Sequence, residues 1–478
     1  MVWLIPLSYS TYSKKGAVMK YPKSFSLSLQ KHFSAKPRVL DYDFRMAFKH
    51  LKIGSLLHSC GIFKEKGIDT MTLLLWIVLV PFLKKPMTSL WLSKHVTKEL
   101  DAKKDTYYRF LNNERFNWRK LIYKLATKVI AQADQTPLQQ KVIIADDTIS
   151  NKTGKKMELV SYHFDHKEHR NTLGYQCLQI GYHNGIQFFP LDVAFYTSQK
   201  RPNTNLRKID KRTCGWKRRQ EAFKKKTDML IQMLQNAYNS GIDAACVLFD
   251  SWFSYDSIIN KVVTTGYNVV CRLKNGNVKY QYQGKDYTLK ELWKHFAKKQ
   301  QRWIAGYPIK GCCLIVSLPE TGEVKLLFTS DGHKKWHGFL ATDLSLDASQ
   351  IVGYYSRRWA IEVFFKDAKQ MLYLGKEQSK TFDAAVAGYS VMMIRYLLLI
   401  YLMNNSRIIG PLGPLFRDVS DTELMLQVAN QLWEQIKHTM FKSIDLFLNR
   451  IEYKYVIKLI DIIEDALFSF KEPLTAKV

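Results

Sequence analysis

The chain has 478 residues, of which 46% are hydrophobic, so it is long enough for two or three folded units and too apolar to be disordered. Its 72 lysines and arginines outnumber its 42 aspartates and glutamates, and the formal net charge is +30. This excess favours a polyanionic partner, most simply nucleic acid, although an RNA-binding or membrane-surface protein would carry the same charge. The seven cysteines form no C-x-x-C pair, which excludes a cysteine zinc site of that kind, gives no sign of a disulfide framework and fits a reducing cytoplasm.

The N-terminal third is predicted to be a basic lead-in followed by helices. Residues 1–40 contain seven lysines and arginines and no acid, and they show little periodicity. Residues 41–135 have a helical pattern, with Asn117 as the predicted N-cap of a helix that starts at Trp118. The apolar runs 71–83 and 391–403 are too short to span a bilayer, so we expect buried helices and no membrane partner.

Thr136-Pro137 marks a boundary, after which strand and helix patterns alternate up to about residue 375. A buried strand starting at Lys141 is predicted to end at Asp146-Asp147-Thr148. Further strands are predicted at 175–182, 186–195, 244–249 and 268–273, with helices at 219–239 and 254–263. Asp250 directly follows the strand 244–249. This order predicts an α/β fold with a mixed sheet and carboxylates at strand ends.

Two further regions complete the predicted domain organisation. Residues 275–340 contain short β-prone runs at 279–282, 302–305, 312–317 and 325–329, which predict a β-rich insertion. Residues 376–478 are predicted to be a helical region, including helices at 384–403 and 421–439, that packs on the core or on a second subunit.

Residues 354–373 are predicted to form one amphipathic helix with a polar face. At about 100° per residue, that face spans roughly 80°. It carries Tyr355, Arg358, Glu362, Lys366 and Lys369. A carboxylate among cations suits a group that holds a metal ion beside a phosphate. An ordinary helix with i,i+4 salt bridges would show the same pattern.

The spacing Tyr355-x2-Arg358-x3-Glu362-x6-Lys369 resembles the Y-R-E-K motif of bacterial cut-and-paste insertion-sequence transposases, the insertion sequence family 4-like group. The segments DDT at 146–148 and VLFDSWFSYDS at 247–257 also look right for this group. The resemblance implies an RNase H-like mixed-sheet catalytic core within 136–375, interrupted by the β-rich insertion. It also implies that the helical region 41–135 binds the element's DNA ends; a structural cap on the core is the alternative.

A DDE active site is what the resemblance implies. Its catalytic and metal-binding residues would be Asp146, Asp250 and Glu362, with Asp147 as the alternative first aspartate. Neighbouring strand residues point to opposite faces, so only one of the two aspartates can face the metal. Carboxylates from separate elements suit two Mg²⁺ ions, for which Mn²⁺ can substitute.

The residues expected to contact DNA lie around Glu362. Those predicted to grip phosphates are Tyr355, Arg358, Lys366 and Lys369. By motif position, Trp359 is a candidate for stacking on a displaced base, and Trp336 in the insertion is a second. Trp303 is expected to be packed. The histidines at 163, 166 and 169 are expected to lie in a solvated segment and not to bind zinc.

These features predict a transposase that cuts and joins its own insertion element, with a hairpin intermediate. The expected partners are double-stranded DNA, at the element ends and the target, and a second subunit in a homodimer. No nucleotide-binding motif is present, so no nucleotide cofactor is expected, and the expected location is cytoplasmic and nucleoid-associated. The alternatives are an inactive, transposase-derived DNA-binding protein and a metal-dependent DNA nuclease that does not transpose.

Overall fold

The computed structural model describes residues 44–84, 104–133, 136–165, 168–198, 207–331, 335–376, 379–408 and 410–421, with Leu424 and Ile462. The basic lead-in and nearly all of the predicted helix 421–439 lie outside this part of the chain. The described residues divide into two compact units, one of residues 111–393 and one of 44–110 with 394–421.

A 12-stranded mixed sheet forms the larger unit. Its first half has the strand order β4-β3-β1-β5-β6, with β1, β5 and β6 parallel to one another and β3 antiparallel to both of its neighbours, β1 and β4. These strands are β1 (Val142–Asn151), β3 (Arg170–His183), β4 (Phe188–Tyr196), β5 (Cys246–Phe249) and β6 (Asn268–Arg272), and β2 (Ser161–Asp165) pairs with the start of β3. This confirms the mixed α/β sheet predicted from the sequence.

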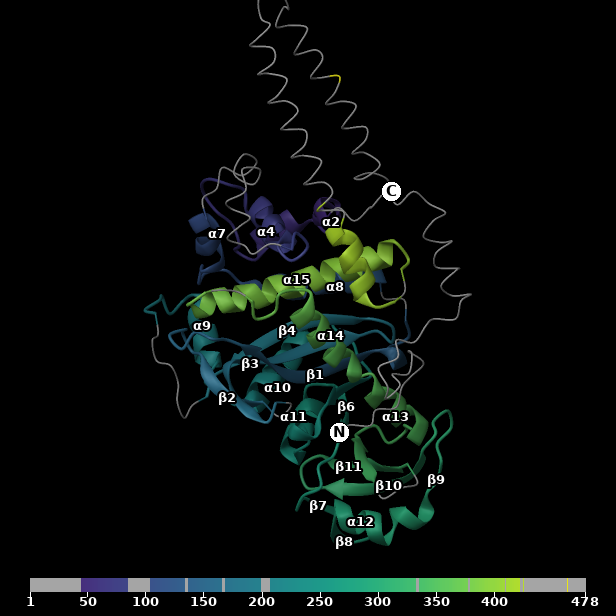
Figure 1. Ribbon diagram of the computed structural model, residues 1–478. Coiled ribbons are helices and arrows are strands. Elements are labelled where there is room, and N and C mark those ends of the chain that lie inside the picture. Colours follow the sequence, from purple (N-terminus) through teal and green to yellow (C-terminus); the bar gives the residue numbers. More distant parts are fainter. Residues whose placement is uncertain are drawn as a thin grey trace, which may run out of the picture. The chain divides into compact units, whose positions relative to one another are not determined.

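Helices cover both faces of this half of the sheet. All residues of β4 but the last are buried, and β4 contacts α8, α9, α10 and α14 (Figure 1). The helices of this half are α8 (Trp118–Ala133), α9 (Cys214–Glu221), α10 (Lys226–Asn239), α11 (Asp256–Thr264), α13 (Ala348–Ser356) and α14 (Trp359–Gln370). The side chain of Asn117 accepts a hydrogen bond from Lys120 N at 3.0 Å, which confirms the predicted cap of α8.

The second half of the sheet is built by the region predicted as an insertion. Strand β12 (Trp336–Ala341) pairs with β6 and carries the sheet on through β11 (Gly322–Ser330) and β10 (Lys310–Leu318) (Figure 1). The remaining elements of this half are β7 (Lys279–Tyr282), β8 (Lys285–Thr288), β9 (Arg302–Trp303), α12 (Leu289–His295) and the 3-10 helix η3 (Ala297–Gln300). The four β-prone runs of the sequence are therefore real strands, and β8, β12 and α12 are additions.

Three of the boundaries that differ from the sequence predictions change the number or length of elements near the candidate acids. Strand β1 does not end at Asp146 but continues to Asn151, because β3 pairs with its whole length. The predicted helix 219–239 is two helices, since the backbone of Lys225 is extended (φ −64°, ψ 140°) between α9 and α10. The predicted single helix 354–373 is also two, α13 and α14.

The smaller unit consists of helices. Its elements are α2 (Phe44–His50), α3 (Ile53–Ser59), α4 (Thr70–Leu79), most of α7 (Lys104–Leu111) and the second half of α15 (Phe382–Asn405). Helix α4 confirms the predicted buried helix, and the guanidinium of Arg395 donates to the carbonyls of Ile77 and Val78 at its end, at 2.6 and 3.0 Å.

Helix α15 confirms the predicted helix 384–403 and extends it by two residues at each end. By length and composition it is, within the described ranges, the one helix able to cross a membrane, but 94% of its apolar window is buried inside the protein. A helix in the core of a folded protein has the same length, apolar composition and burial.

Candidate active site

Asp146 lies within β1, and Asp250 directly follows the neighbouring parallel strand β5. Strand β5 pairs with β1 only over the first residues of β1, with Val142 opposite Cys246 and Ile144 opposite Leu248. Continued by two residues, this register would bring Asp250 level with Asp146. Residues two apart on a strand point to the same face, so both side chains are expected on the face of Ile144 and Leu248. Asp250 also caps the 3-10 helix η2 (Ser251–Phe253), accepting from Ser251 N at 2.6 Å.

Arg358 brings the third acid to this face. Its Nη1 donates to Oδ2 of Asp146 at 2.8 Å, and its Nη2 donates to Oε1 of Glu362 at 2.5 Å. The side chain of Arg358 is only 10% exposed, whereas those of Asp146 and Glu362 are 22% and 23% exposed. A nearly buried guanidinium thus joins strand β1 to helix α14 at a point that the solvent reaches.

The junction between α13 and α14 aims Arg358 at the acids. There the backbone N–H groups of Arg357, Arg358 and Ala360 bond to carbonyls three residues earlier, at 3.1, 3.1 and 3.0 Å. Such 3-10 bonds turn the chain by about 120° per residue instead of about 100°. Arg358 and Glu362 therefore share a face, as predicted, but Tyr355 lies in a different helix and is turned inward.

Electrostatics identify one shared acidic site. Burial raises the pKa of Asp146 to about 7, with Asp147 and Glu362 acting in the same direction and Arg358 opposing them. Burial alone would lower the pKa of Arg358, but a phenol and three carboxylates hold it above its usual value. The three carboxylates are Asp146, Glu362 and Asp250. All three candidate acids therefore act on the same guanidinium.

Asp147 points away from this group. Its Oδ2 accepts from Nζ of Lys226 at 2.7 Å and from Nε2 of Gln176 at 3.0 Å. The strand alternation expected from the sequence is thus observed, with Asp146 facing Glu362 and Asp147 facing α10.

The predicted phosphate-binding residues fall in two environments. Tyr355 is buried, with its ring 4.9 Å from that of Phe339 and 5.8 Å from the Arg358 guanidinium, and burial raises the pKa of its phenol. Lys366 and Lys369 are exposed on α14, on the turns that follow Glu362.

The tryptophans considered for base stacking also differ in their exposure and packing. Trp359 is 47% exposed at the start of α14. Trp336 stacks on Trp293 at 5.2 Å with an interplanar angle of 13°, inside the second half of the sheet. Trp303, expected to be packed, is 70% exposed, because β9 is a short edge strand paired only with β10. Trp252, which sequence reasoning missed, is 47% exposed two residues after Asp250.

The histidine segment was predicted wrongly at one position. His163 is buried, and its Nε2 lies 2.8 Å from the hydroxyl of Ser161, because β2 turns this residue inward in its alternating burial pattern. His166 lies outside the described residues.

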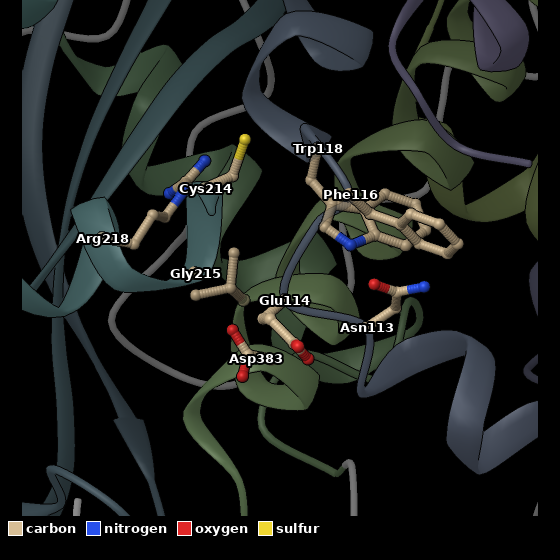
Figure 2. A pocket seen from close by; sticks show the side chains of 9 residues that line it. Asn113, Glu114, Phe116, Trp118, Cys214, Gly215, Arg218 and Asp383 are labelled. Atoms are coloured by element: carbon tan, nitrogen blue, oxygen red, sulfur yellow. The ribbon is translucent and has the colours of Figure 1, made fainter. Parts of the chain in front are cut away.

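A small pocket elsewhere in this unit does not compete as a site. It lies between the segment before α8, the start of α9 and the start of α15, and it has room for about one water molecule (Figure 2). Residues that line it include Glu114, Trp118, Arg218 and Asp383, and none of the candidate catalytic residues is among them.

A divalent cation suits the donors of the acidic site. As they stand, no three His, Cys, Asp or Glu side chains within the described ranges are close enough to hold a metal ion, and Arg358 lies between Asp146 and Glu362. The donors are nevertheless carboxylate oxygens, which Mg²⁺ prefers. A half-buried carboxylate with a pKa of about 7 is also one that a cation would stabilise in its ionised form.

Comparison with known families agrees with this geometry. The family described as DDE superfamily endonuclease matches residues 84–286, and the family described as Transposase DDE domain matches residues 221–398. The first range contains Asp146 and Asp250, and the second contains Asp250 and Glu362. A search of curated proteins gives no match. The fold and these matches define an enzyme that cleaves DNA, with an RNase H-like core. Within that class, the two matches indicate a DDE transposase.

Proposed function

We propose that this transposase moves its own insertion element by cutting and pasting, as a member of the YREK group of the insertion sequence family 4-like enzymes. The observation that carries the proposal is the link from Asp146 through Arg358 to Glu362, with Asp250, directly after the neighbouring strand β5, acting on the same guanidinium. Three acids from three elements act on one point of the sheet, and the exposed Lys366 and Lys369 lie on the same helix as Glu362.

Asp146, Asp250 and Glu362 are the proposed catalytic residues and would hold two Mg²⁺ ions, with Mn²⁺ as a substitute. Bound there, the ions supply activation of the attacking oxygen and stabilisation of the leaving oxygen in an in-line displacement. Arg358 exchanges a carboxylate partner for an oxygen of the scissile phosphate, which its planar guanidinium fits. Tyr355 holds Arg358 in place from the buried side, while Lys366 and Lys369 bind flanking phosphates and Trp359 stacks on a displaced base.

The proposed reaction begins with hydrolysis. A water oxygen forms a bond to phosphorus at the element end, and the bond to the 3′ oxygen breaks, leaving a 3′-hydroxyl and a 5′-phosphate. The 3′-hydroxyl oxygen then bonds to phosphorus of the opposite strand, the flanking DNA leaves with a free 3′-hydroxyl, and the element end closes as a hairpin. A second water attacks the hairpin phosphodiester, which releases the element's 3′-hydroxyl and leaves a 5′-phosphate. The 3′-hydroxyl finally attacks a phosphodiester of the target DNA and displaces a 3′-hydroxyl of the target strand.

Two element ends must be held together, so we propose that a homodimer acts on double-stranded DNA. The region 41–135 is the proposed end-binding part, and the region 376–478 is the proposed dimerisation part. The net charge of +30 supports a DNA partner. We place this activity in the cytoplasm, at the nucleoid.

The test is a joining assay with the wild-type chain. A DNA fragment that carries the coding region's own flanking ends is incubated with a supercoiled target in Mg²⁺, in Mn²⁺ and in EDTA. Metal-dependent joined products support the proposal, and a strand of doubled length on a denaturing gel reports the hairpin. Cuts without joining would indicate a nuclease that does not transpose, and binding without cuts would indicate an inactive, DNA-binding derivative.

A further inference from the structure

Trp252 occupies an unusual position for a large aromatic side chain. It lies in η2, the short helix capped by Asp250, and its ring makes an edge contact with Phe253 at 4.7 Å. It is nevertheless 47% exposed. Isolated exposed hydrophobic residues are normal on protein surfaces, so exposure alone indicates nothing.

A neighbouring cation, Lys226, gives the Trp252 ring a defined environment. Nζ of Lys226 lies 4.1 Å from the centre of the Trp252 ring and 2.7 Å from Oδ2 of Asp147. The Lys226 side chain is only 12% exposed. A lysine fixed between a carboxylate and an aromatic face loses its usual freedom, and it holds the ring in one orientation.

This arrangement ties Trp252 to both acid-bearing strands. Through the chain it is two residues from Asp250, and through Lys226 and Asp147 it is linked to the residue next to Asp146. Asp147 thereby receives a role distinct from metal binding, because it anchors Lys226. The exposed Lys224 and Lys225 directly precede Lys226 and add positive charge to the same segment.

We propose that Trp252 is a stacking platform for an unpaired base of the DNA strand beside the scissile phosphate, positioned by Lys226 and Asp147. An exposed aromatic ring next to lysines is the combination with which proteins bind single strands, because every base has a face that can stack. The proposal rests on the proposed DNA substrate, and it adds a second aromatic site to Trp359.

The experiment measures binding in EDTA, where no cleavage takes place. Two fluorescent probes of arbitrary sequence are compared, a fully paired short duplex and the same duplex with a few unpaired nucleotides at one end. Trp252→Ala is expected to weaken binding of the forked probe by roughly 5- to 150-fold, and binding of the paired duplex by less than about twofold. Trp252→Phe is expected to retain most of the affinity because it keeps an aromatic face.

Trp303→Ala is the matched control. Trp303 is also exposed and also has a lysine over its ring, Lys310 at 5.0 Å, but it lies on β9 of the insertion. The Trp303→Ala substitution should leave the affinity for both probes unchanged. A thermal melt of each variant checks that it is folded. Equal losses on both probes, no loss, or no preference of the wild type for the forked probe would overturn the proposal. Because this readout needs no catalysis, a failed joining assay would reject the proposed function and leave this result standing.

Discussion

At the scale of single residues, Arg358 is the side chain on which the acidic site depends. It neutralises Asp146 and Glu362 with two separate N–H groups, a geometry that lysine cannot reproduce. The sequence placed Arg358 and Glu362 on a common face by their spacing of four. It could not show that Asp146 is their partner, since 212 residues separate Asp146 from Arg358.

Arg358→Lys should therefore lower the cleavage rate while DNA binding changes little. Loss of a charge-assisted hydrogen bond is typically worth about 1.5–3 kcal/mol, or roughly 10- to 150-fold in rate. The decrease in cleavage rate is measured under single-turnover conditions. Arg357→Lys is the control, because Arg357 donates to the carbonyl of Gln140 instead of to an acid. Similar rates for the two variants would show that Arg358 acts only as a positive charge.

Metal affinity should depend on pH through Asp146. Its pKa of about 7 lies above the usual value, so the carboxyl keeps its proton as the pH falls below 7 and cannot ligate a cation. Because folding raises this pKa, the protonated Asp146 carboxyl contributes to the stability of the metal-free protein at acid pH. That contribution is lost as the pH rises through about 7. Mn²⁺ binding measured by calorimetry should weaken about tenfold or more between pH 8 and pH 5.5. An affinity that stays constant over this range would contradict the assignment of Asp146 as a ligand.

At the scale of elements, the sequence predicted the alternation of strands and helices better than their ends. Apolar runs and turn residues located the core strands and four strands of the insertion. The end of β1 was missed because its last residues, from Asp146 onward, are polar except for Ile149 and owe their strand conformation to pairing with β3. The junction of α13 and α14 was missed because local periodicity continues across it, whereas the break coincides with Tyr355 packing on Phe339 of β12.

A buried ion cluster joins three segments of the larger unit. Arg219 of α9 donates to both carboxylate oxygens of Glu158, at 2.7 Å each, and to those of Asp383 in α15, at 2.9 and 2.7 Å. The three side chains are 3–5% exposed. Without Arg219, two carboxylates would remain buried and unpaired.

Arg219→Met should destabilise the protein by about 3–5 kcal/mol, since a buried charge without its partner is costly. Chemical denaturation followed by circular dichroism measures the change. Arg212→Met is the control, because Arg212 pairs with Asp210 on the surface and its loss should have little effect. Equal midpoints for the two variants would show that the cluster contributes no more than a surface pair.

At the scale of the whole molecule, composition predicted the partner class but not its binding surface. A charge of +30 points to a polyanion wherever the lysines lie. The grouping of Lys226, Trp252 and Asp147 depends on helix α10, whose Lys226 reaches both Asp147 of β1 and Trp252 of η2. No local sequence pattern contains it, although the tryptophan directly after Asp250-Ser251 was visible.

DNA binding should fall steeply with salt. A protein that contacts about 6–10 phosphates loses roughly 10³–10⁵ in affinity between about 50 and 200 mM salt. Titrations of a duplex at several salt concentrations should give a linear fall of log affinity with log salt. An affinity that does not change with salt would mean that the positive charge has another purpose.

Replacement of Glu362 tests the central claim most directly, because this residue is the carboxylate that helix α14 contributes to the three candidate acids. Glu362→Gln keeps the size of the side chain and removes its charge, and Glu323→Gln, at an exposed position of β11, is the control. With Mg²⁺ and the element's own ends, Glu362→Gln is expected to bind DNA but neither cut nor join it, while the control does both. Cleavage that survives in Glu362→Gln would show that the active site lies elsewhere in the chain.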